Sequence, residues 1–225
     1  MKSVVLRLEG PMQAWGTRGR YSIRDTDAEP SKSGVIGLLG CAMGMRRDDR
    51  NTLDQLRRLS MAVRVDRPGR VIRDLHTVGA GKFRGAPHSM WGLGDKTVLT
   101  QRYYLVDAAF TVALGGDDSS LVERIAAAIQ EPVWPLFLGR RSCAPSETVF
   151  LAIHAGPPVD AVRMAPLARG AGARVRLVID APAGSTTTLR PDDPISFVSD
   201  NRQFAFRQVH DSWLDLAPDG AGSKP

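Results

Sequence analysis

The stretch MAVRVDRPGRVIRDLHTV, Met61 to Val78, decides the fold of this chain. Apolar and basic residues alternate from Met61 to Val65, and this period of two predicts a strand that pairs on through RVIRDLHTV. After a glycine-rich segment, TQRYYLVDAAFTVAL predicts further strand structure up to Leu114. Strand segments therefore follow one another here with no helix between them.

Helices are predicted on either side of these strands. Residues 31–45 begin with serines that suit an N-cap and continue as an apolar run, and residues 51–59 predict a short second helix. A serine followed three residues later by glutamate forms a capping box, which predicts a helix over about 120–130. Strands at 4–8 and 147–154 then complete the order β-α-β-β-α-β.

This order predicts an α+β fold whose core is ferredoxin-like (RRM-like), with the arrangement βαββαβ over residues 1–155. A long insertion at about 79–98 interrupts the core and shows no periodicity. The short strands RVRLVID, PISFVS and QFAFRQV predict a smaller β-rich C-terminal unit over 156–212. Residues 213–225 predict a flexible tail.

The charge balance favours an anionic partner. The formal net charge is +6 and the sequence pI is about 9.8, so nucleic acid is the first candidate. No run of about 18 apolar residues is present and the N-terminus lacks a secretory apolar core, which predicts a cytoplasmic protein without a membrane span. Cys41 and Cys143 stand alone, so we predict no metal site, no cofactor and no disulfide.

The loop GPMQAWGTRGR, which follows the first strand, is the first candidate site. Gly16 lets a backbone approach closely, Trp15 suits stacking on a base, and Arg18 suits a phosphate. The alternative is that Trp15 caps the core at the end of the first strand, because large aromatic side chains are mostly buried. Both interpretations of Trp15 remain open from the sequence.

Glycine and basic residues also meet at two turns. SKSG at a predicted helix start would offer free N–H groups and a lysine to an anion, although an ordinary N-cap has the same sequence. LFLGRRSC lies between the second long helix and the last strand of the core, where it would clamp a sugar-phosphate backbone or form a solvated turn. The residues concerned are Lys32, Ser33 and Gly34, and Gly139, Arg140, Arg141 and Ser142.

The insertion GAGKFRGAPHSMWGLGDK combines flexibility with basic and aromatic side chains. Lys82, Phe83, Arg84 and Trp91 would lie across a single strand or wedge between protein neighbours. The competing interpretation is a disordered loop, given the number of glycines.

A catalytic function has weak support in the sequence. Metal-independent RNA cleavage needs a general base and a cation for the phosphorane charge, which His76 with Tyr21, Lys32 or Lys82 would supply. The histidines share no recognisable catalytic spacing, and no paired-carboxylate, nucleophile-elbow or phosphate-loop motif is present. We therefore expect a protein that is not an enzyme.

Several blocks of sequence, in order along the chain, resemble one known family. The blocks are LRLEGPMQAWG, SKSGVIGLLGCAMGMRRDD, RDLHTV, FTVAL, FLGRRSC and RQFAFRQV. Over residues 5–209 they resemble the CasD subunit family of the type I-E CRISPR Cascade surveillance complex, within the repeat-associated mysterious protein superfamily. The resemblance implies a ferredoxin-like core with a thumb-like insertion and a role in antiviral defence.

The resemblance also implies partners and site residues. The protein would bind the 5′ handle of the CRISPR RNA without cutting it, cap the backbone subunits, contact the large PAM-recognising subunit, and meet target DNA only through the complex. The loop 13–18, the helix start 32–34 and the turn 139–142 would face the handle, with His76 among the RNA-binding residues. The insertion would be the thumb that meets a backbone subunit. The alternative is a metal-independent endoribonuclease that processes precursor CRISPR RNA, because the corresponding subunit of type I-C systems resembles this fold.

Overall fold

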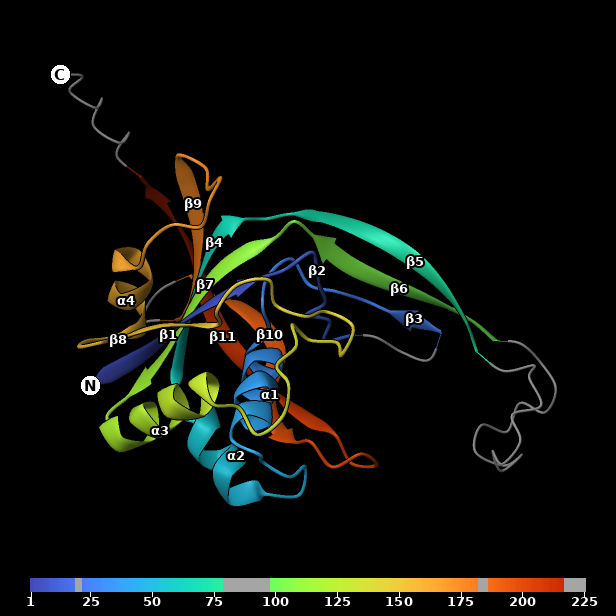
Figure 1. Cartoon of the computed structure of the whole chain (residues 1–225), viewed down its shortest axis with the longest axis horizontal. Helices are drawn as coiled ribbons and strands as arrows, with labels where there is room; N and C mark the ends of the chain where they lie inside the picture. Colours follow the sequence, from blue (N-terminus) through green and yellow to red (C-terminus); the bar gives the residue numbers. More distant parts are fainter. Residues whose placement is uncertain (19–21, 79–97, 182–185, 217–225) are drawn as a thin grey trace.

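The computed structural model describes residues 1–18, 22–78, 98–181 and 186–216, and it combines helices with mostly antiparallel sheets (Figure 1). The elements in chain order are β1 (Lys2–Glu9), β2 (Met12–Gln13), β3 (Ile23–Arg24), α1 (Lys32–Ala42), α2 (Arg50–Arg57), β4 (Ser60–Arg67), β5 (Arg70–Val78), β6 (Val98–Val106), β7 (Ala109–Gly116), α3 (Ser119–Gln130), β8 (Phe150–His154), α4 (Pro158–Met164), β9 (Arg174–Asp180), β10 (Thr188–Ser196) and β11 (Gln203–Asp215).

The larger sheet has seven strands in the order β10-β11-β9-β4-β7-β1-β8. Its central strands are buried along nearly their whole length, because α1 and α3 pack on one face and α4 packs on the other (Figure 1). Strands covered on both faces need apolar side chains at consecutive positions, as in Val4, Val5 and Leu6. This sheet forms the rigid base on which the loops of the molecule are placed.

The smaller sheet joins β2, β6 and β3, with β5 paired to β6 (Figure 1). We call the long pair β5–β6, with β3 beside it, the arm. The predicted pairing of Met61–Val65 with the run RVIRDLHTV is wrong, because β4 pairs with β7 and β9 whereas β5 pairs with β6. Gly69, at φ +69°, turns the chain out of the first sheet. β5 is exposed along nearly all of its described length, so of the two strands β4 and β5 only β4 has the burial of a central strand.

The helix starts agree in part with the sequence. Ser31 is the N-cap of α1, as predicted, and accepts a hydrogen bond from the N–H of Gly34 at 3.3 Å. The predicted capping box at Ser120 is wrong, because the Asp118 carboxylate caps α3 by accepting from the N–H of Leu121 at 3.1 Å. A carboxylate is the stronger acceptor at the positive end of a helix.

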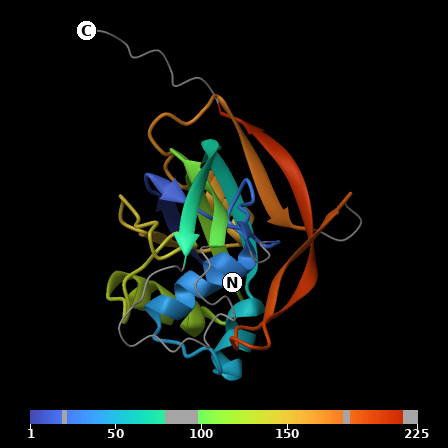
Figure 2. The ribbon, with the colours of Figure 1, turned by 90° about the vertical axis from the view of Figure 1, so that its right-hand side faces the viewer.

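The C-terminal strands extend the larger sheet. β9 pairs with β4, and β11 then pairs with β9 on one side and β10 on the other (Figure 2). β11 continues to Asp215, which pairs with Arg174, so the predicted start of a tail at 213 is wrong. The division into a core and a C-terminal unit stays a prediction. The insertion at 79–97 and residues 217–225 lie outside the described residues.

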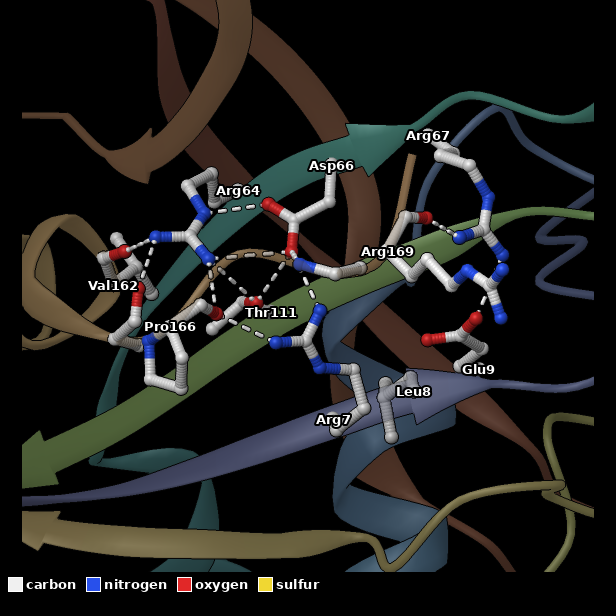
Figure 3. A network of polar contacts seen from close by, with 12 residues as sticks. Arg7, Leu8, Glu9, Arg64, Asp66, Arg67, Thr111, Val162, Pro166 and Arg169 are labelled. Atoms are coloured by element: carbon white, nitrogen blue, oxygen red, sulfur yellow. Dashed lines mark hydrogen bonds and ion pairs between the residues drawn. The ribbon is translucent and has the colours of Figure 1, made fainter. Parts of the chain in front are cut away.

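A buried network of arginines attaches α4 to the sheet (Figure 3). The Asp66 carboxylate accepts from Arg7 at 2.7 Å and from Arg64, and both guanidinium groups also donate to the carbonyl of Pro166. Arg64 further donates to the carbonyl of Val162 in α4. Two cations share one carboxylate, and carbonyl oxygens at and just beyond the C-terminal end of α4 accept further protons from both guanidinium groups, so the buried charge is well partnered.

Candidate nucleic-acid interface

A cleft of about 700 Å³ lies beside α1. One wall is the glycine-bearing face of α1, and the opposite walls come from the segment 134–141 and from the turn between β10 and β11. Residues 14–16, which follow β2, complete it. The cleft therefore brings together residues from four distant parts of the chain, among them three of the four segments that the sequence indicated. Its lining is Ala14, Trp15, Gly16, Ser31, Ser33, Gly34, Gly37, Leu38, Gly40, Cys41, Met45, Arg47, Trp134, Pro135, Leu136, Phe137, Gly139, Arg141, Phe197, Arg202 and Phe204.

The glycines of α1 leave its cleft face open at one position. A Cβ atom at Gly37 would meet nothing within 4 Å, whereas one at Gly34 would come within 2.8 Å of the Trp15 ring. A Cβ atom at Gly40 would approach the side chain of Met45 at 2.6 Å. Gly34 is thus required by packing against the Trp15 ring, the Met45 side chain covers Gly40, and Gly37 is the place where another molecule can approach the helix backbone closely.

Trp15 lies at the floor of the cleft with Gln13 beneath it, and both side chains are buried. Trp15 is 1% exposed and its indole N–H donates to the amide oxygen of Gln13 at 2.9 Å. The Gln13 amide then donates to the carbonyl groups of Leu8 and Ala108. The prediction that Trp15 stacks on a base is wrong for this conformation, since its ring is enclosed by the protein, and the alternative of a core cap holds. The close backbone approach predicted at Gly16 comes from the chain itself, because a Cβ atom there would lie 2.1 Å from the carbonyl oxygen of Asp25.

At the N-terminus of α1, a backbone N–H group is already bound by a carboxylate of the same chain. The backbone N–H of Lys32 donates to the Asp192 carboxylate at 2.9 Å. The Lys32 side chain is buried, and burial lowers the pKa of its ammonium group against the opposing attraction of Asp180 and Asp193. The predicted phosphate contact of Lys32 is therefore wrong, because Asp192 already occupies the helix start. Ser33 and Gly34 do line the cleft.

In the turn 139–142, the side chains of the two adjacent arginines have different surroundings. Gly139 has φ +84°, and a Cβ atom there would lie 1.7 Å from the carbonyl oxygen of Ala14, so only glycine fits. Arg141 lines the cleft, whereas Arg140 donates to the carbonyl of Tyr103 in the arm at 2.9 Å. Backbone carbonyl groups accept protons from both terminal nitrogens of Arg140, and its contact with RNA stays a prediction. Ser142 is exposed and lies outside the lining of the cleft.

Two further arginines at the cleft were missed by the sequence analysis. Arg47 follows α1, and Arg202 lies in the turn between β10 and β11. Within the described residues, no carboxylate lies within 4 Å of the guanidinium groups of Arg47, Arg141 or Arg202. Partial burial, together with the nearby charges of Arg47 and Arg24, lowers the pKa of Arg202. Like charges gathered in this way favour the binding of an anion.

Aromatic side chains lie among these arginines. Trp134 is 44% exposed and Phe204 is 40% exposed, and Phe137 and Phe197 line the same cleft. Exposed aromatic rings beside guanidinium groups suit unstacked bases and their phosphates. The arrangement therefore has the chemistry of a site for single-stranded nucleic acid. Cys41 also lines this cleft, and burial raises the pKa of its thiol although Arg141 lowers it.

The remaining predicted residues lie elsewhere. His76 is on β5 of the arm, where its Nε2 lies 2.7 Å from the Asp74 carboxylate, and it does not line the cleft. Arg18 is exposed, with its guanidinium 3.7 Å from the carboxylate of Asp27. The insertion residues Lys82, Phe83, Arg84 and Trp91 lie outside the described residues.

In the part of the chain that the structure describes, no three His, Cys, Asp or Glu side chains gather as a metal site. No helix over the same residues is both long and apolar enough to cross a membrane.

Comparison with known proteins gives consistent matches. The family model described as CRISPR-associated protein (Cas_Cas5) matches residues 3–210. The CRISPR system Cascade subunit CasD of Escherichia coli (strain K12) is 39% identical over 160 residues, which cover 66% of this chain and 69% of that protein.

Solved structures agree with this match. A chain of a CRISPR RNA-guided surveillance complex has a TM-score of 0.80 and 36% identity, with 95% of this chain and 90% of that chain covered. A crystal structure of a Cas protein has a TM-score of 0.73 and 33% identity, with 95% of each chain covered. The mixed α+β fold with mostly antiparallel sheets is thus common to all three.

Proposed function

The chain belongs to the CRISPR-associated Cas5 family, and from this premise we propose that it is a non-catalytic Cascade subunit that binds the 5′ handle of CRISPR RNA in the cleft beside α1. The observation that carries the proposal is the convergence of Arg47, Arg141 and Arg202 on a cleft that also exposes aromatic rings. Such a surface suits a single strand whose bases are unstacked and whose phosphates face cations.

The strand order supports a ferredoxin-like core as part of this proposal. Within the seven-stranded sheet, β4, β7, β1 and β8 are consecutive neighbours, and all three of their pairings are antiparallel. In chain order these are the four strands of the βαββαβ unit, and α1 and α3 are its two helices. The segment that lines the cleft follows α3 directly, so this core would set the position of the site.

The partners follow from the relatives. The related protein of E. coli is a Cascade subunit, and a related solved structure is a chain of an RNA-guided surveillance complex. We infer that this chain likewise joins backbone subunits and the large PAM-recognising subunit, and that it meets target DNA through them. Contact between the thumb-like insertion and a backbone subunit stays a prediction.

The arrangement favours binding over RNA cleavage. Lys32 is buried against Asp192, and His76 is on the arm rather than in the cleft, so these two candidate groups lie apart. A general base and a cation must both reach the reacting phosphate for metal-independent cleavage.

The experiment that tests the proposal measures binding and cleavage together. We would mix the full chain, in buffer with a chelator, with a labelled precursor RNA that contains the repeat. We expect binding that needs an intact 5′ handle, and no cleavage. Arg202→Ala and Arg47→Ala should each weaken binding about fivefold to tenfold, which corresponds to about 1–1.4 kcal/mol.

Arg163→Ala provides the matched control, because Arg163 is an exposed arginine on α4 at the opposite face of the sheet. This variant should bind as tightly as the parent chain. If the isolated chain does not bind, the same variants are measured in the reconstituted complex. Equal losses for Arg163→Ala and Arg202→Ala would contradict the assignment of the cleft, and RNA cleavage that is lost in His76→Ala would establish the nuclease alternative.

A further inference from the structure

Phe206 on β11 is the most exposed phenylalanine or tryptophan in the part of the chain that the structure describes, at 70%. It lies two residues after Phe204, which lines the cleft. Alternate side chains of a strand point to the same face, and exposure alternates here, with Phe204, Phe206 and Gln208 exposed and the residues between them less so. A row of two rings and an amide therefore begins in the cleft and continues outside it.

The opposite face of β11 holds this row in position. Arg207 donates to the Asp192 carboxylate at 3.0 and 2.8 Å and to that of Asp180 at 2.5 Å. The two irregularities in the pairing of β10 with β11 each add a residue to β10, so β11 keeps its regular alternation. The two rings are thus fixed to the same regular strand.

The spacing of the rings suits two bases that are not stacked on each other. Two residues along a strand span about 6.8 Å, whereas stacked nucleotides of one strand follow one another at about 3.4 Å. Phe204 and Phe206 can therefore each stack on one base where the nucleic acid is single-stranded and extended. Aromatic side chains on the exposed face of a sheet bind successive bases in this manner in RNA-binding modules.

The charges around the row do not oppose an anionic strand. By register, Leu189 and Pro194 of β10 lie beside this row, and neither is charged. Asp193, the second carboxylate of β10, accepts from Arg57 at 2.5 Å. At the cleft end of the row, Arg202 supplies a cation. A phosphate backbone can therefore follow the row without meeting a free carboxylate of β10.

We propose that Phe206 is a second stacking position for the RNA bound in the cleft, and that it takes the unpaired base next to the base on Phe204. The strand then leaves the cleft along the outer face of β11, with the Gln208 amide next in the row as a partner for a base edge. This proposal rests on the proposed function, since it takes RNA as the ligand of the cleft. A protein partner would also cover an exposed phenylalanine, but the row is continuous with the lining of the cleft, and this continuity favours RNA.

The test measures affinity and contact separately. The ligand is a labelled CRISPR RNA with an intact 5′ handle, and fluorescence anisotropy gives its affinity for the full chain. For contact, 5-iodouracil replaces each base in turn from the 5′ end, because this base cross-links under ultraviolet light to an aromatic side chain that stacks on it. Mass spectrometry then identifies the cross-linked residue. If the isolated chain does not bind, both measurements are made in the reconstituted complex.

Phe206→Ala should lower the affinity about fivefold or more and abolish the cross-link at this position. Its melting temperature should not change, because the side chain is exposed. Phe206→Trp should keep both the affinity and the cross-link, since an indole ring also stacks on a base. The slope of log affinity against log salt should be the same in all three chains, because no charge is removed.

Trp213→Ala is the matched control, because Trp213 is a 58% exposed aromatic residue near the other end of the same strand. Its ring lies 5.2 Å from the guanidinium carbon of Arg174, away from the row that begins in the cleft. This variant should bind RNA as tightly as the parent chain.

The outcomes separate this position from the cleft itself. Parent affinity in Phe206→Ala, or no cross-link to Phe206 from any base, would overturn the second position, and a loss of affinity in Arg202→Ala would leave the proposed function standing. If Phe206→Ala binds RNA normally but fails to assemble with the other Cascade subunits, the ring faces a protein and the proposal is overturned. RNA binding that is absent in both the isolated chain and the reconstituted complex would overturn both proposals.

Discussion

Trp15 and Gln13 form a buried polar pair at the point where the first strand meets the cleft. The Trp15 ring lies under Gly34 of α1, and its N–H group is satisfied by Gln13, whose own amide protons are satisfied by backbone carbonyls. A large aromatic side chain with its polar group paired contributes strongly to a core. These two residues therefore support the floor of the cleft from below.

Trp15→Ala should accordingly destabilise the protein. Removal of a buried tryptophan side chain costs about 3–5 kcal/mol, so the midpoint of urea unfolding, followed by far-UV circular dichroism, should fall substantially. Trp134→Ala is the control, because Trp134 is 44% exposed and its loss should weaken RNA binding with little effect on the midpoint. An unchanged midpoint for Trp15→Ala would place the ring at the ligand surface after all.

Single residues were the level at which the sequence was least informative. Arg140 and Arg141 are neighbours of the same type, yet one holds the arm and the other lines the cleft. Lys32 and Ser33 likewise separate, the first into the interior and the second to the cleft. In turns and at helix starts no periodicity fixes the direction of a side chain, and only the packed structure decides it.

At the scale of elements, α1 has two kinds of glycine on the face that meets the cleft. Gly34 is covered by Trp15, and Gly37 is open. The difference matters because a bare helix face lets a ligand approach the backbone, whereas each glycine inside a helix costs about 0.5–1 kcal/mol relative to alanine. The helix thus gives up stability at Gly37 for space within the cleft.

Substitutions at these two positions should have opposite effects. Gly37→Leu should fill the cleft and weaken RNA binding about tenfold without lowering the melting temperature, and the smaller Gly37→Ala should raise stability. Gly34→Ala should lower the melting temperature, because its methyl group would press on the Trp15 ring. Thermal unfolding and anisotropy on the three variants check this. Normal RNA affinity in Gly37→Leu would show that no ligand passes over α1.

Elements were predicted better than their pairing. Ser31 begins α1 where expected, and strands occur at 61–65 and 70–78 as predicted, because caps and alternation are local signals. The predicted partner of β4 was wrong, because its true partners, β7 and β9, lie far along the chain and no local signal identifies them. Burial decides which strands β4 pairs with. The apolar side chains of β4 need packing on both faces of the strand, and the centre of the larger sheet provides it.

For the whole molecule, the site depends on segments that the fold assembles from across the chain. Arg47 follows α1, Arg141 follows α3, and Arg202 lies between the last two strands. No spacing in the sequence relates these positions, which is why the net charge of +6 indicated an anionic partner but not where it binds. The cleft and its cations are a property of the tertiary structure.

This assembly predicts how RNA affinity depends on salt. Each phosphate neutralised on a single strand contributes about −0.7 to the slope of log K against log salt, so contacts from Arg47, Arg141 and Arg202 should give a slope of about −2. The slope is measured by anisotropy in potassium chloride from about 50 to about 200 mM.

The variants then separate charge from shape. Arg202→Ala should reduce the steepness by about 0.7, because one phosphate contact is lost. Gly37→Leu should lower the affinity at every salt concentration and leave the slope unchanged, since it removes space and no charge. If Arg202→Ala gave a line parallel to that of the parent, this guanidinium would not face a phosphate. The salt dependence would then have to arise from Arg47, from Arg141 or from cations outside the cleft, with Trp134 and Phe204 contributing by stacking.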